Sequence, residues 1–289
     1  GETQTTYDIS FEEPYYNNKE LSLRGDLYSK FTDPTSVKYE TEDLGLGFSI
    51  GFPLATQISY RFSYSLYTTK IKADADANAY ELLLAGTDTI SSISNSITYD
   101  KRNSPYKPSR GSLTRFNSTI AGLGGTSYYV QNKAEYRKYK RLSKKFIGAL
   151  KLEGGHLDGY NGEYTPINAN FKLGGKNLRG FKSGKMGPKS GTSYYGGQYY
   201  YLTSVETNID LPLDEFDITS TFFVDAGSVW GLDSRYGVIN DEHKLRSSAG
   251  INLLWDSTIG PINLVFAKPI SKEETDTVDT FYFDIGYNF

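Results

Sequence analysis

The carboxy-terminal nine residues, 281–289, alternate strictly between two kinds of side chain. The apolar positions are Phe281, Phe283, Ile285, Tyr287 and Phe289. A side-chain period of two defines a β-strand, and an apolar face with an aromatic residue at each end is typical of a strand that meets lipid outside and water inside. An edge strand of a soluble β-sandwich shows the same alternation, so this strand by itself leaves both folds open.

Three other segments, 42–51, 58–67 and 245–256, repeat the alternation. One face of each carries mainly Leu, Ile, Phe or Tyr, and the opposite face carries mostly Gly, Ser and charged residues. Such a polar face is poor material for the core of a sandwich, but it suits the water-filled interior of a barrel. The sequence therefore predicts an all-β, antiparallel, up-and-down transmembrane β-barrel.

The composition agrees with this fold and excludes several others. Tyr and Phe, with 25 and 16 residues, favour strands. The mean hydropathy of -0.49 is compatible with a barrel, because only alternate residues of each strand face lipid. No apolar run is long enough for a spanning helix. A net charge of -3 gives no reason to expect a nucleic-acid partner, and the absence of Cys rules out disulfides and thiolate metal sites.

About thirteen segments fit the strand pattern. They lie near residues 5–12, 21–30, 39–51, 57–68, 89–100, 111–122, 127–139, 145–155, 198–211, 218–229, 245–256, 260–269 and 281–289. Every second connection is short. The connections between them include long ones, at 69–88, 156–197, 230–244 and 270–280. Short periplasmic turns and longer outer loops alternate in this way in a meandering barrel, which places Phe289 at the periplasmic rim.

An odd number of strands is unusual for a bacterial single-chain barrel. Gly1 precedes the first predicted strand by only a few residues, without an initiator Met or a signal peptide. We therefore expect this sequence to be a piece of a longer precursor that is cut within its barrel.

An ordered set of motifs carries a family resemblance. The most specific is FKLGGKNLRGFKSGKMGPK at 171–189, in the longest loop. The others are ISFEEPYY (Ile9–Tyr16), the turn at 100–105, AGLGG at 121–125, FFVDAGSVW at 222–230, WDSTIGPI at 255–262 and the terminal strand. Over essentially its whole length, the chain resembles the BamA family of outer-membrane-protein assembly factors, a bacterial surface antigen family.

The resemblance implies a barrel of sixteen strands preceded by periplasmic POTRA modules. In that frame residues 1–289 form the barrel domain without the POTRA modules and the first three strands, and loop 156–197 is extracellular and folds into the lumen. The implied location is the bacterial outer membrane. The implied partners are membrane lipids, nascent outer membrane proteins and accessory lipoproteins that bind through the periplasmic modules.

Strand phase and resemblance together predict a site. Alternation places Glu206 and Asp225 on the inner faces of neighbouring strands, where two carboxylates need a cation. The resemblance supplies Arg179 from the folded-back loop, with Gly180 allowing close approach and Phe181 anchoring the tip. The alternative from the residues alone is that the carboxylates hydrate a pore and Arg179 lies on the surface.

Other candidate residues are interpreted as structural. We expect His156 and His243 to be solvated loop residues, and the run with Asp74 and Asp76 lacks the glycine and terminal glutamate of a calcium loop. The basic cluster 133–145 is expected at a periplasmic turn, facing lipid head groups, an acidic partner or water. No catalytic residue, metal site or cofactor is predicted.

Four functional classes follow. The leading hypothesis is a non-enzymatic assembly factor that folds and inserts outer membrane proteins, using its own strand edge as a template. The alternatives are a related RGF-loop translocation or secretion transporter of the TamA or two-partner type, a passive porin-like channel, and an outer-membrane hydrolase. The last needs a convergent Ser, His and acid, which the sequence does not suggest.

The terminal residue gives a first testable prediction. Phe289 should close the periplasmic aromatic girdle, and the apolar face of the terminal strand resembles the signal by which barrel proteins are themselves recognised. Deletion of Phe289 or its replacement by Asp should therefore leave the full-length parent poorly inserted. Heat-modifiable migration on a gel measures insertion, and Asn288→Asp on the polar face is the matched control. Normal migration of the Phe289 variants would contradict this role.

Overall fold

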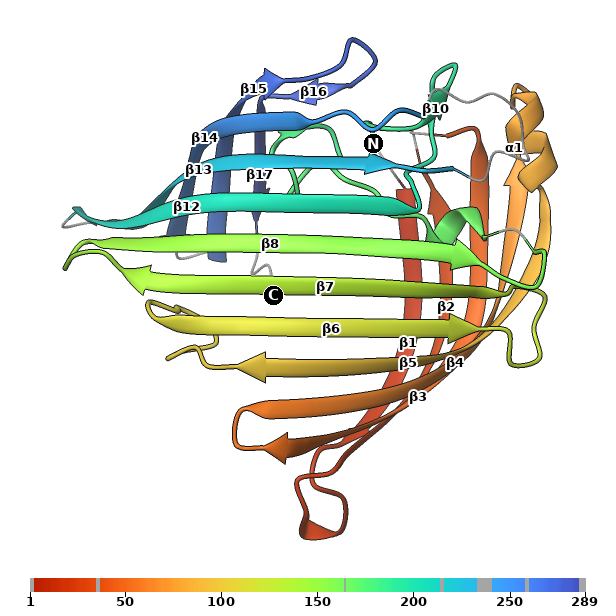
Figure 1. Ribbon diagram of the computed structural model, residues 1–289, viewed down its shortest axis with the longest axis horizontal. Coiled ribbons are helices and arrows are strands. Elements are labelled where there is room, and N and C mark those ends of the chain that lie inside the picture. The colour runs from red at the N-terminus through yellow and green to blue at the C-terminus, as the bar shows by residue number, and fades with distance from the viewer. Residues whose placement is uncertain are drawn as a thin grey trace.

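The computed structural model describes residues 3–34, 37–163, 165–213, 216–232, 241–257 and 260–285. Thirteen strands form one antiparallel sheet in chain order (Figure 1). They are β1 (Thr3–Glu13), β2 (Ser22–Asp33), β3 (Tyr39–Ala55), β4 (Ile58–Ala73), β5 (Gly86–Asp100), β6 (Gly111–Ala121), β7 (Tyr129–Arg141), β8 (Phe146–Gly159), β12 (Tyr199–Leu213), β13 (Phe216–Trp230), β14 (Arg246–Ser257), β15 (Gly260–Ser271) and β17 (Phe281–Ile285). Each of them matches a predicted segment, which confirms the all-β meander.

The sheet is strongly curved and remains open. Figure 1 shows its strands bending around an interior that holds parts of the long loop between β8 and β12. The sheet order begins at β1 and ends at β17, and within the described ranges these two strands are not paired with each other. The structure thus has the curvature of a barrel wall without closure.

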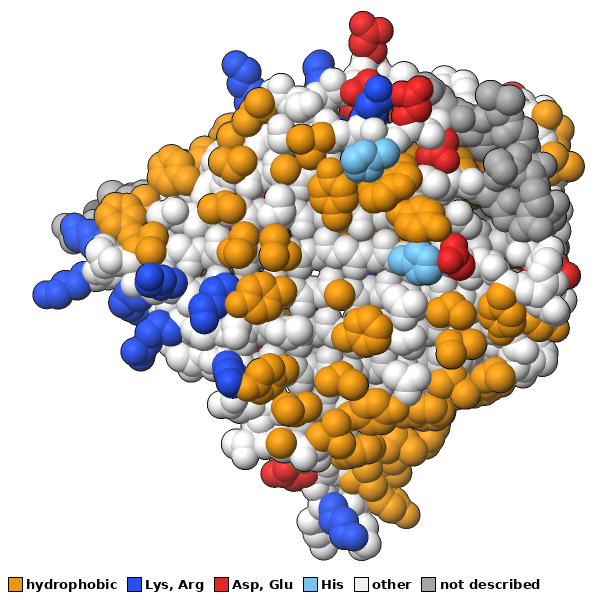
Figure 2. Space-filling model, viewed as in Figure 1, with side chains coloured by type: hydrophobic (Ala, Val, Ile, Leu, Met, Phe, Trp, Pro, Cys, Tyr) orange, Lys and Arg blue, Asp and Glu red, His pale blue; other side chains and the backbone are white. Residues whose placement is uncertain are grey.

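The two faces of the strands differ as the alternation predicts. In β3, Leu44, Leu46 and Phe48 point outward and are exposed, whereas Thr41 and Ser49 point inward and are buried. Figure 2 shows apolar side chains spread over the outer face of the sheet. Within the described part of the chain, no helix has the length and apolar character to cross a membrane.

The connection between β4 and β5 contains a helix that the sequence analysis did not predict. This helix, α1 (Ala79–Leu84), begins with a capping box in which Asn78 and Glu81 bond each other's backbone N–H groups. The buried Glu81 carboxylate also accepts a hydrogen bond from the Lys38 backbone N–H at 2.8 Å. Because the helix is only six residues long, its cap and the contact with Lys38 stabilise it rather than helix propensity.

The connection between β8 and β12 differs from the predicted loop in its bounds, and it contains short regular elements that were not predicted. β8 continues to Gly159, so the loop begins later than the predicted residue 156. It contains the 3₁₀ turn η2 (Ile167–Ala169) and the short strands β9 (Gly180–Phe181), β10 (Lys189–Ser190) and β11 (Ser193–Tyr194), and another 3₁₀ turn, η1 (Tyr16–Asn18), lies between β1 and β2. Such short elements carry too few residues for a periodic signal.

Apolar side chains of this loop pack against the inner wall. Leu173, Leu178, Phe181 and Met186 form a buried cluster with residues of β12 and β13. The wall residues of this cluster are Tyr200, Leu202 and Val229. This packing brings the loop tip to the functional site.

Candidate functional site

Arg179 lies in a turn immediately before β9, with its guanidinium directed at the inner wall. Its Nε donates to Asp225 Oδ2 at 2.7 Å, and its Nη2 donates to Asp225 Oδ1 at 2.7 Å. The same Nη2 donates to Glu206 Oε1 at 2.6 Å. The structure thus brings together the three residues that strand phase and family resemblance suggested.

Strand register explains why the two carboxylates meet. On adjacent strands β12 and β13, Ser204 is directly opposite Asp225, and Glu206 is directly opposite Phe223. Side chains at these four positions therefore share the inner face. Ser204 Oγ donates to Asp225 Oδ1 at 2.6 Å and accepts from Arg179 Nη2 at 3.0 Å.

Phe223 is a site residue that the sequence analysis missed. The central carbon of the Arg179 guanidinium lies 3.6 Å from the centre of the Phe223 ring, which is a close cation–π contact. Phe223 is two residues from Asp225 on the same strand, so the alternation alone predicts that its side chain points inward. It also packs with Val265 and Tyr282, so it connects the Arg179 cluster to the terminal strand.

The backbone around the arginine is fixed as well. Arg179 N donates to Asp225 Oδ2 at 3.2 Å, and Arg179 O accepts a hydrogen bond from Ser248 Oγ on β14. Gly180 has a φ of +92°, and an added Cβ would lie 3.2 Å from the Ser248 Cβ. Glycine therefore meets both requirements at this position, a left-handed backbone and a close approach to β14.

The two carboxylates that bind Arg179 differ in their exposure to solvent. The Asp225 side chain is 0% exposed, while the Glu206 side chain is 29% exposed and borders a cavity that Arg137 and Lys151 also line. Burial by itself lowers the pKa of Arg179. Hydrogen bonding and charge from Asp225 and Glu206 outweigh this effect, so the pKa is raised above its usual value. Arg179 is held as a cation.

This asymmetry predicts different effects for the two carboxylates. Asp225→Asn should destabilise the folded full-length protein by about 3 kcal/mol or more, because it breaks the buried, doubly bonded pair. Glu206→Gln should cost about 1 kcal/mol, because water screens its ion pair. The temperature at which the folded band disappears from a gel measures both. A larger loss for Glu206→Gln would contradict the assigned roles.

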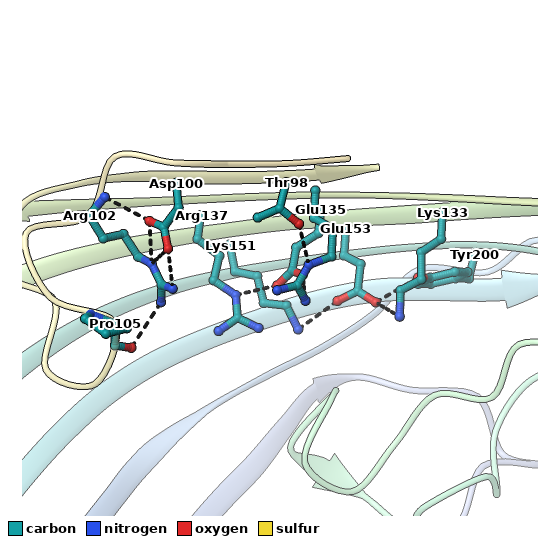
Figure 3. A network of polar contacts seen from close by, with 11 residues as sticks. Thr98, Asp100, Arg102, Pro105, Lys133, Glu135, Arg137, Lys151, Glu153 and Tyr200 are labelled. Atoms are coloured by element: carbon teal, nitrogen blue, oxygen red, sulfur yellow. Dashed lines mark hydrogen bonds and ion pairs between the residues drawn. The ribbon is translucent and has the colours of Figure 1, made fainter. Parts of the chain in front are cut away.

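A ladder of charged residues covers the inner wall beside this cluster (Figure 3). Lys133 and Lys151 each lie 2.8 Å from a Glu153 carboxylate oxygen, and Arg137 pairs with Glu135. Of the alternatives for the basic cluster 133–145, contact with lipid head groups is therefore wrong for Lys133 and Arg137. Lys133 and Arg137 belong to β7 and have the strand phase of the inner face, so they neutralise the wall instead of facing head groups.

The expectation that both histidines are solvated loop residues is correct for His243, which is exposed in the segment before β14, and wrong for His156. His156 lies in β8, where Nε2 is 2.7 Å from Asp158 Oδ2 and the ring centre is 5.2 Å from that of Tyr199. The His243 ring packs edge-on against Trp230 with 4.5 Å between centres. His156 therefore belongs to a strand, whereas His243 lies in a connection.

The acidic run contributes no assembled metal site. Asp76 Oδ2 lies 2.9 Å from Lys38 Nζ, and this contact lowers the pKa of the carboxyl group below its usual value. Among the described residues, no three His, Cys, Asp or Glu side chains are grouped so that they could hold a metal ion.

The terminal strand is described through Ile285. Phe281 and Phe283 are exposed on the outer face, with 62% of Phe283 accessible. The Ile285 side chain and the predicted signal residues Tyr287 and Phe289 lie outside the described part of the structure. For these three residues the outward direction remains a prediction.

Comparison with a family model decides the family. The Omp85 superfamily domain matches residues 1–289, which is the entire chain. The chain belongs to the Omp85 superfamily. Among Omp85 relatives, it is 28% identical over 335 residues to the outer membrane protein assembly factor BamA of Neisseria meningitidis, covering 100% of this chain and 42% of that protein.

Two further Omp85 relatives have similar identity. BamA of Neorickettsia risticii is 26% identical over 264 residues, covering 90% of this chain and 36% of its own length. The sorting and assembly machinery component 50 homolog B of Xenopus laevis is 28% identical over 306 residues, covering all of this chain and 65% of its own length. The chain thus spans less than two thirds of each relative.

Solved structures agree on the Omp85 fold. BamA from Haemophilus ducreyi lacking POTRA domains 1–3 superposes with a TM-score of 0.86 at 24% identity, over 97% of this chain and 61% of that chain. CdiB from Acinetobacter baumannii is more distant, with a TM-score of 0.59 at 13% identity over 98% of this chain and 49% of that chain. These superpositions show a shared fold, and BamA from Haemophilus ducreyi is the better match of the two.

Proposed function

We propose that this chain is the barrel portion of a bacterial outer-membrane assembly factor that folds and inserts outer membrane proteins. The observation that carries the proposal is the loop tip, where Arg179 forms hydrogen bonds with Asp225 and Glu206 on the inner wall. The BamA names of two relatives support the same activity.

The docked loop favours an assembly factor over a passive channel. A porin needs a lumen that stays open to water. Here the buried cluster of Leu173, Leu178, Phe181 and Met186 places loop residues against the interior of the wall. Such a loop reduces the open cross-section of the lumen.

The activity is non-enzymatic in this proposal. Insertion requires that a client strand pair its backbone groups before it meets hydrocarbon, and an existing strand edge provides a template for such pairing. The free energy then comes from the folding of the client itself. We further propose periplasmic POTRA modules in the full-length protein, with accessory lipoproteins bound through them and outer-membrane lipids around the barrel.

Reconstitution of the full-length protein tests the proposal. Liposomes that contain it should fold an added, unfolded outer membrane protein faster than empty liposomes do, as measured by heat-modifiable migration. Deletion of residues 174–190 should reduce that acceleration. Absence of acceleration, together with a large and steady conductance that the deletion leaves unchanged, would favour the channel.

A further inference from the structure

A second buried ion pair lies at the amino-terminal end of β14, where Arg246 is the first residue of the strand. Arg246 donates from Nε to Asp276 Oδ2 at 3.0 Å and from Nη2 to Asp276 Oδ1 at 3.1 Å. The two side chains are 3% and 0% exposed, so the pair is buried at least as deeply as the Arg179 cluster. Its fork geometry uses both carboxylate oxygens, an arrangement that specifies position as well as charge.

The pair organises the connection between β15 and β17. Asp276 Oδ2 also accepts from the Glu273 backbone N–H at 2.8 Å, and Asp276 N donates to Glu273 O at 3.1 Å. On the other side, Arg246 Nη1 donates to Lys244 O at 3.0 Å. One ion pair therefore ties a turn in the connection 272–280 to the beginning of β14.

The connection 272–280 forms backbone hydrogen bonds with the RGF tip, which is the loop segment 179–181 and the residues that follow it. Within the connection, β16 (Val278–Asp279) pairs antiparallel with β9, which is Gly180–Phe181. Lys182 N donates to Thr277 O at 2.9 Å, and Thr277 N donates to Lys185 O at 3.0 Å. The loop tip is thus held on two sides, by the Arg179 cluster on the wall and by a short strand pair with the connection.

The same connection leads directly into the terminal strand. β17 begins at Phe281, immediately beyond β16 and Thr280. A side-chain contact adds to the chain link, since Lys176 Nζ of the loop lies 3.1 Å from Asp284 Oδ1 of β17. The position of the loop and the position of the terminal strand are therefore linked through residues 272–280.

We propose that Arg246 and Asp276 are positioning residues that hold the connection 272–280 where it pairs with the RGF tip, so that loop docking and the start of β17 depend on each other. This inference deepens the proposed assembly function. A simpler interpretation is that the pair only stabilises the end of the β14–β15 hairpin. The two differ in their effect on the contact between β9 and β16.

Disulfide trapping in the full-length protein measures that contact directly. The chain contains no cysteine, so Lys182→Cys with Thr277→Cys introduces one defined pair. Opposed residues in antiparallel strands have Cα atoms about 4.5–5.5 Å apart, which lies within the disulfide range. The pair should form a disulfide readily under mild oxidation in membranes.

In that background, Asp276→Asn should lower the extent of disulfide formation several-fold. Arg246→Lys should lower it less, because an ammonium keeps the charge and loses the fork. Arg179→Ala should also lower it, because coupling between two docking sites is reciprocal. Asp76→Asn is the matched control, since it removes the ion pair with Lys38 on another connection and should leave trapping unchanged.

Heat-modifiable migration of each variant establishes that the barrel is folded. Unchanged trapping in both folded variants, Asp276→Asn and Arg246→Lys, would overturn the proposal and leave only hairpin stabilisation. If Asp276→Asn fails to fold, the Arg246→Lys variant decides by the same criterion. Trapping requires no client protein, so this result is separate from success or failure of the proposed assembly function.

Discussion

Arg179→Ala should release the loop from the inner wall and strongly lower the assembly activity of the full-length protein. The substitution leaves Asp225 buried without its cation and removes the contact with the Phe223 ring. Loss of one partner of a buried ion pair costs about 3–5 kcal/mol. Water around Glu206 reduces this cost, but the Asp225 side has no such relief.

The rate of client folding in liposomes and the thermal stability of the folded band measure the effect. Arg179→Lys should restore only part of both, because an ammonium lacks the planar fork that reaches two carboxylates. Arg24→Ala is the matched control, since Arg24 is a partly exposed arginine 3.8 Å from Glu12. Equal losses in the Arg179→Ala and Arg24→Ala variants would contradict the role of the Arg179 cluster.

Phe181→Ala should destabilise the docked loop about as strongly, through packing instead of charge. The Phe181 side chain is fully buried among Leu173, Leu178, Met186 and residues of the wall. Truncation of a buried phenylalanine to alanine typically costs about 3–5 kcal/mol, from lost transfer free energy and the remaining cavity. The loop should then become accessible to protease while the strands remain paired.

Limited proteolysis at the lysines of the loop and assembly activity in liposomes test this second prediction. Phe116→Ala is the control, because it removes the same side chain from the exposed outer face of β6. Protection of the loop in Phe181→Ala equal to that in the parent would show that packing of Phe181 is not needed to hold the tip. The Arg179→Ala and Phe181→Ala effects should be less than additive, because both remove the same docked state.

Alternation along the chain predicted the strands well, because a wall between water and an apolar phase imposes a period of two on every segment. The outward Leu44 and Phe48 and the inward Ser49 follow this rule, as do Glu206 and Asp225. The same rule also predicts that Phe223 points inward, but this was overlooked because aromatic residues of these strands mostly face outward. Motif resemblance added Arg179, which no period in a loop identifies.

The features that the sequence analysis did not predict share one physical cause, which is contact with residues distant in the chain. Helix α1 depends on Glu81 being buried against the backbone of Lys38, and His156 belongs to a strand because it pairs with Tyr199 of β12. Neither partner lies within the same element. Local patterns therefore indicated exposed loops at both places, and tertiary contacts changed the outcome.

By itself, the sequence determined which residues form strands, which face of each strand is apolar, and that Glu206 and Asp225 share an interior. Only the tertiary structure decided how the loop docks, that Ser248 binds the Arg179 carbonyl, and that Arg246 pairs with Asp276. The reason is that the period of a strand is a local property set by lipid and water. The partner of a buried charge is set by strand register and loop packing between residues far apart in the chain.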